Sequence, residues 1–123
     1  MAQNLAKVKR KEAAEPIYGT RVLFLFGGTE RESSDAAVEW MQSECGENCE
    51  PDESESSGRV FESGKGHFVV WVKDPGDFSA LTHEIVHAGV RAMDHIGHPI
   101  AKGTDEPLAY YCDWLTSEAI KAQ

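Results

Sequence analysis

The sequence lacks any apolar run that approaches the roughly 20 residues of a membrane-spanning helix, and its N-terminus lacks the apolar core of a secretion signal. Positive charge is also scarce, because 12 Lys and Arg stand against 21 Asp and Glu, for a formal net charge of -9. Binding along a phosphate backbone depends on clustered Lys and Arg. We therefore expect a soluble protein whose partners are neither membranes nor nucleic acids.

Cysteine is scarce as well. The three cysteines, Cys45, Cys49 and Cys112, cannot all pair within one chain, which favours a reducing compartment over a disulfide-stabilised scaffold. Cys45 and Cys49 have no neighbouring histidine in the sequence, so a second metal site at this pair is disfavoured. The expected location is the cytoplasm.

The length of 123 residues, 41% of them hydrophobic, is that of one folded domain. Residues 1–16 are charged and rich in alanine, and we interpret them as a flexible N-terminal arm that includes at most a frayed helix. Residues 17–123 form the domain. Within it, residues 44–58 are too acidic to bury anything and predict a flexible loop.

The remaining pattern predicts an α+β domain. Residues 21–26 are an apolar, partly β-branched run typical of a buried strand, and a helix capped by Ser33 or Ser34 follows. Residues 59–63 and 67–73 predict a β-hairpin. A helix over 78–95, begun at Asp77 or Ser79 and ended at Gly97, precedes a last helix capped by Thr104 that reaches residue 121.

The helix over 78–95 carries the motif His-Glu-x-x-His. His83 and His87 lie one turn apart on one helix face, so both imidazoles can reach a single zinc ion. Glu84 projects beside such an ion, where its carboxylate can take a proton from a zinc-bound water. The alternative is a pair of surface histidines on an amphipathic helix.

A third candidate ligand, Glu106, follows His87 after 18 intervening residues, in the first turn of the last helix. The pattern His-Glu-x-x-His-x18-Glu resembles the gluzincins, the thermolysin-like superfamily of zinc peptidases, and the segment after Glu106 is similar to small proteins with this motif from bacteria and tailed phages. The resemblance covers roughly residues 67–118. It implies a minimal zincin-like domain, in which a small, mainly antiparallel sheet packs on the active-site helix and on a C-terminal ligand helix.

The resemblance also implies supporting roles. Asp105 is matched to the residue that orients a zinc-bound histidine, and the strand over 67–73 is matched to the strand whose edge binds extended substrate. Where many gluzincins have an aspartate four residues after the ligand glutamate, this chain has Tyr110, and Asp113 is the candidate substitute. The larger enzymes have a second lobe that supplies groups that stabilise the transition state, and we expect none here because 123 residues leave no room for it. Tyr110 is our candidate for that task, ahead of Tyr111, His95 and His98.

We therefore expect a zinc-dependent hydrolase, a small metallopeptidase that acts on a protein or peptide through Glu84. One alternative is a non-catalytic protein, such as a phage particle component or a regulatory subunit, in which zinc only pins the last two helices together. It implies a partner protein or an assembly, and a phage particle as the location. Another resemblance, to zinc proteins that cleave repressors, implies a protein target and gives the acidic loop a role in recognition.

Overall fold

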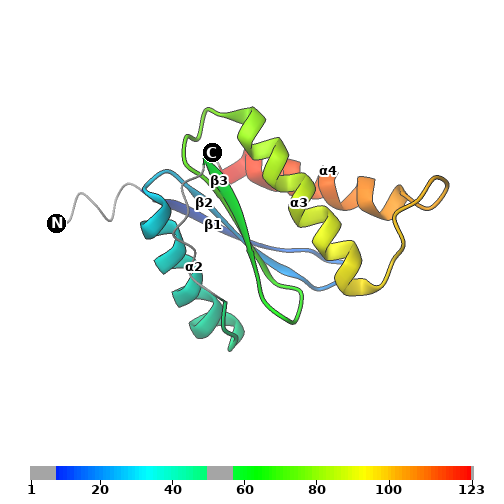
Figure 1. The fold of residues 1–123 in the computed structure, drawn as a ribbon, viewed down its shortest axis with the longest axis horizontal. Helices are drawn as coiled ribbons and strands as arrows, with labels where there is room; N and C mark the ends of the chain where they lie inside the picture. The colour runs from blue at the N-terminus through cyan, green and yellow to red at the C-terminus, as the bar shows by residue number, and fades with distance from the viewer. Residues whose placement is uncertain (1–7, 50–56, 123) are drawn as a thin grey trace.

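The computed structural model describes residues 8–49 and 57–122 (Figure 1). The elements in that part of the chain follow in this order: β1 (Lys9–Ala14), β2 (Arg21–Phe26), α2 (Glu30–Cys45), β3 (Gly58–Glu62), β4 (Phe68–Val72), α3 (Phe78–Ile96) and α4 (Glu106–Ala122). None of the helices in these ranges has the length and apolar character needed to cross a membrane.

The strands form one sheet in the order β1-β2-β4-β3. β1 pairs with β2 and β3 pairs with β4, both antiparallel, whereas β2 and β4 are parallel neighbours. The predicted α+β class and the predicted hairpin are confirmed. The parallel pair arises because α2 carries the chain from the end of β2 across one face of the sheet before β3 and β4 are laid down.

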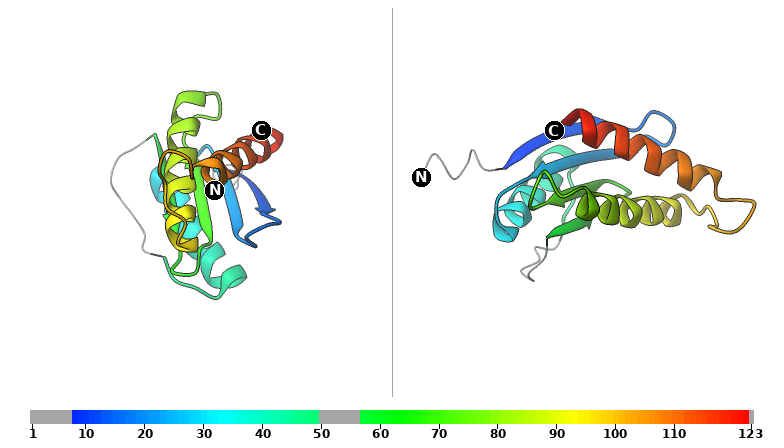
Figure 2. Two further views of the ribbon diagram at one scale, coloured as in Figure 1. Left: turned by 90° about the vertical axis from the view of Figure 1, so that its right-hand side faces the viewer. Right: turned by 90° about the horizontal axis from the view of Figure 1, so that it is seen from above.

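Helices cover both faces of the sheet. α2 lies on one face, and α3 and α4 lie on the other (Figures 1 and 2). Alternate residues of the central strands face the two layers. Phe24 and Val70 pack under α3 and α4, and Leu23 and Trp71 pack under α2. The sheet is therefore buried on both faces, and α3 is held rigidly over β3 and β4.

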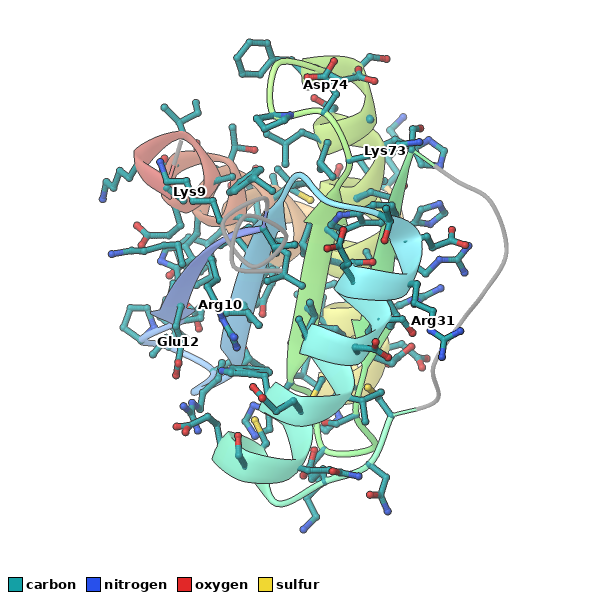
Figure 3. All side chains as sticks on the ribbon, turned by 90° about the vertical axis from the view of Figure 1, so that its left-hand side faces the viewer. Lys9, Arg10, Glu12, Arg31, Lys73 and Asp74 are labelled. Carbon is teal, nitrogen blue, oxygen red and sulfur yellow. The ribbon has the colours of Figure 1, made fainter. Side chains whose placement is uncertain are left out.

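The prediction for the N-terminus is wrong over residues 9–14. This segment is the edge strand β1, in which Lys9 pairs with Phe26 and Ala14 with Arg21. Figure 3 shows Lys9, Arg10 and Glu12 on this strand. Charged residues suit an edge strand because their side chains remain in water and discourage pairing with another chain. Residues 1–7 of the predicted arm, and residues 50–56 of the predicted acidic loop, lie outside the described residues.

The helix ends were predicted with mixed success. α2 begins earlier than expected, because Thr29 is the cap and forms a capping box with Glu32, while Ser33 and Ser34 are buried inside the helix. α3 begins after Asp77, whose carboxylate accepts the N–H of Ala80, and ends at Gly97 in the left-handed conformation, as predicted. The motif-bearing helix is therefore fixed at both ends.

Candidate functional site

The site is built around two histidines on α3. His83 and His87 are exposed, and their Nε2 atoms lie 3.0 Å apart. Two Nε2 atoms bound to one zinc ion at about 2.0 to 2.1 Å would lie between about 2.9 and 3.4 Å apart for ligand angles between about 90° and 110°. The rings therefore converge as the two-histidine part of the motif requires.

Glu84 lies on the inner side of this pair. It is only 8% exposed, and within the described residues its carboxylate has no hydrogen bond or ion pair. Neither carboxylate oxygen is among the fully buried side-chain atoms that lack a partner, so the carboxylate remains accessible to water. An accessible carboxylate with no structural contact, next to two converging histidines, is available to act as a base.

Strand β3 lies beside Glu84 and forms an edge of the sheet. The bonds from Ser63 N–H to the His67 carbonyl and from Lys73 N–H to the Ser57 carbonyl set the pairing pattern, so Gly58 and Val60 direct their backbone groups away from β4. The predicted match of residues 67–73 to an open substrate-binding strand is wrong, because β4 is paired on both sides. The open edge next to the histidines belongs to β3.

Two adjoining hollows connect these parts. One, of about 450 Å³, lies toward the start of α3, and the other, of about 260 Å³, lies toward its middle. Both are lined by Gly58, His83 and Glu84. Arg59, Val60, His87 and Arg91 complete the second hollow. The histidines, the carboxylate and the strand edge therefore share one surface depression.

Gly58 is needed for this arrangement. A Cβ at this position would lie 2.9 Å from Glu84 Cγ and 3.0 Å from the Trp71 carbonyl oxygen. The oxygen belongs to the central strand and cannot move, so Gly58→Ala must displace Glu84 or β3. We expect a loss of about 1 to 3 kcal/mol of unfolding free energy, measured by urea denaturation. Gly64→Ala is the matched control, since no atom lies within 4 Å of its added Cβ; equal losses would contradict the steric argument.

Glu106 is not brought to the histidine pair. It is exposed at the start of α4, and α4 packs on the part of α3 around Gly89, where an added Cβ would meet Leu108 and Cys112. Gly89 follows His87 by two residues, which is about 200° around the helix. Glu106 and the histidines thus lie on opposite sides of α3. Among the described residues, no group of three or more His, Cys, Asp or Glu is placed to hold a metal ion.

Tyr110 is also directed elsewhere. Its hydroxyl donates to Glu15 Oε2, in the turn between β1 and β2, and this hydrogen bond to a carboxylate raises the pKa of Tyr110 to about 12. Tyr111 is fully buried, and burial raises its pKa to about 12 as well. The role predicted for Tyr110 beside the zinc therefore has no support in the geometry. Asp105, just before α4, and Asp113, within α4, are both exposed. Within the described residues, neither forms a group of three candidate metal ligands with the histidine pair.

Sequence reasoning missed two residues of the site. Gly58 carried no signal, because it stands at the end of an acidic segment and its role depends on the approach of α3 to β3. Arg91 did carry one, since it follows His87 by one helical turn. Its Nη1 donates to the outward carbonyl of Val60 at 3.3 Å, which ties α3 to the edge strand.

The residues present fit a divalent ion in part. His83 and His87 fit it in ligand type and convergence, whereas the predicted third ligand does not. Comparisons with family models, curated proteins and solved structures find no match to this chain.

Proposed function

We propose that this protein is a metal-dependent hydrolase, with zinc held by His83 and His87 and with Glu84 as the general base, and that its substrate is a peptide or a protein. The observation that carries the proposal is the Glu84 carboxylate, without a partner in the described part of the chain and facing the same depression as the converging histidines.

Zinc bound at such a site would polarise a substrate carbonyl and make a water molecule more acidic. Glu84 then accepts a proton from the attacking water and returns it to the departing amine, so the carboxylate is unchanged after one turnover.

The backbone of β3 favours a peptide over a small molecule. Gly58 and Val60 direct their N–H and C=O groups outward beside Glu84, and an extended peptide can pair with such an edge. Pairing with Gly58 would hold a peptide bond next to the carboxylate. Arg91 already occupies the Val60 carbonyl, so the open part of the edge is short.

The rival function is a non-catalytic, zinc-stabilised structural or regulatory protein. In its simplest form zinc pins α3 to α4, but the histidines face away from the contact of α4 with α3 at Gly89. A zinc ion on His83 and His87 would not join these helices. This form of the alternative is disfavoured.

Metal analysis tests the site itself. We expect about one zinc per chain in the parent protein, and loss of zinc in His83→Ala and His87→Ala, because removing one of two imidazoles abolishes chelation. Bound metal is measured by mass spectrometry of the elements after dialysis. His98→Ala is the matched control, since His98 interacts with the Thr104 carbonyl in the loop before α4. Equal zinc in all four proteins would refute the site.

A further inference from the structure

The open edge of β3 presents alternate residues to an added strand. The pairing pattern with β4 directs the backbone N–H and C=O groups of Gly58, Val60 and Glu62 away from the sheet. An extended peptide that pairs with this edge would bond to these residues in turn, since such pairing uses every second residue. Val60 is the middle one of the three.

Arg91 covers this middle position. It follows Glu84 on α3 by seven residues, which is about two helical turns, so both side chains lie on the side of α3 that faces β3. Arg91 Nη1 donates to the Val60 carbonyl at 3.3 Å, and Arg91 Nε lies 3.6 Å from Glu62 Oε1. We call these two contacts the Arg91 clasp. They occupy the carbonyl that an added strand would need.

The clasp contributes little to stability. The side chains of Arg91 and Glu62 are 42% and 43% exposed, and an ion pair of such exposure is weak. Its position matters more, because charged side chains placed over a strand edge discourage pairing with another chain. Gly58, by contrast, has no side chain and borders both hollows beside Glu84. The edge is therefore open next to the candidate base and covered two residues further on.

We infer that the Arg91 clasp is an autoinhibitory contact, which closes the β3 edge at Val60 and limits an extended peptide to pairing at Gly58 until the clasp opens. The inference rests on the proposed function, since it takes the substrate to be an extended peptide, but it does not depend on a bound metal ion. It deepens that proposal by making Arg91 the residue that controls how much of the edge a substrate can use.

Peptide affinity tests the clasp, by NMR titration of the full-length protein with the uncharged, strand-forming peptide N-acetyl-Thr-Val-Thr-Val amide. Arg91→Met keeps the apolar stem and removes the donors, so it should bind the peptide about 3- to 10-fold more tightly than the parent, the range of one net hydrogen bond. Lys102→Met is the matched control, because it removes the same charge from an exposed position between α3 and α4. Equal or weaker binding by Arg91→Met, or binding by none of these proteins, would overturn the inference. Zinc content and the effect of Glu84→Gln test the proposed function separately.

Amide hydrogen exchange shows where the peptide lies. The peptide should protect the Gly58 N–H in the parent and in Arg91→Met, whereas it should protect the Val60 N–H only in Arg91→Met. Glu62→Gln loses the ion pair but keeps the hydrogen bond from Arg91 to Val60, so its affinity should fall between those of the parent and Arg91→Met. Tighter binding by Arg91→Met without protection of Val60 would place the peptide away from this edge and overturn the inference. Protection of Val60 in the parent to the same degree as in Arg91→Met would also overturn it.

Discussion

Replacing Glu84 by glutamine should lower the rate of hydrolysis by about 10²- to 10⁴-fold, the usual contribution of a general base. The amide is nearly isosteric but cannot accept the proton of the attacking water. Zinc content should remain that of the parent, because His83 and His87 are unchanged. Unfolding free energy should be close to that of the parent, because the amide is nearly isosteric with a carboxylate that has no partner in the described part of the chain.

The rate can be measured on a mixture of peptides of defined sequence, which is incubated with the parent and with Glu84→Gln. Cleavage products are then identified by mass spectrometry. Asp94→Asn is the matched control, because Asp94 is an exposed acid on the same helix, three residues before its C-terminal glycine. A peptide cut by the parent and by Glu84→Gln at equal rates would exclude the proposed mechanism. Parent protein that holds zinc and cleaves nothing would favour the structural alternative.

Replacing Glu15 by alanine should destabilise the fold by about 3 kcal/mol, because a buried acceptor of several hydrogen bonds is lost at once. Glu15 is 1% exposed, and its Oε1 accepts the N–H groups of Ile17 and Tyr18 at 2.9 and 2.5 Å, while Oε2 accepts the hydroxyl of Tyr110. The variant leaves these donors unpaired and releases α4 from the turn between β1 and β2.

Two measurements separate this effect from a general loss of stability. Urea denaturation gives the change in unfolding free energy, and Glu39→Ala is the control. Glu39 is exposed, and its Oε1 lies 3.8 Å from Arg10 Nη1 in a weak surface ion pair. The second measurement is an absorbance titration of the tyrosines. The pKa of Tyr110, raised to about 12 by Glu15, should fall toward its ordinary value of 10.0 in Glu15→Ala. An unchanged tyrosine titration would show that Glu15 does not bind Tyr110.

Some elements were predictable because their signals are local. The apolar run of β2, the hairpin of β3 and β4, and the limits of α3 depend on residues a few positions apart, and the structure agrees with them. The N-terminal strand was missed for the opposite reason. Lys9 to Ala14 has no strand-like pattern of its own, and it is a strand because the open edge of β2 supplies its partner.

The candidate site also has a part that local sequence predicts and a part that only the tertiary structure places. The sequence by itself determined that His83 and His87 converge and that Glu84 lies next to them, because residues four apart on a helix always share a face. The sequence could not predict the position of Glu106, because a loop of nine residues between α3 and α4 can lead to either side of α3. Only the tertiary structure decided the side, because the missing side chain of Gly89 admits α4 closely and Glu15 binds Tyr110, and both contacts join residues that no local pattern connects.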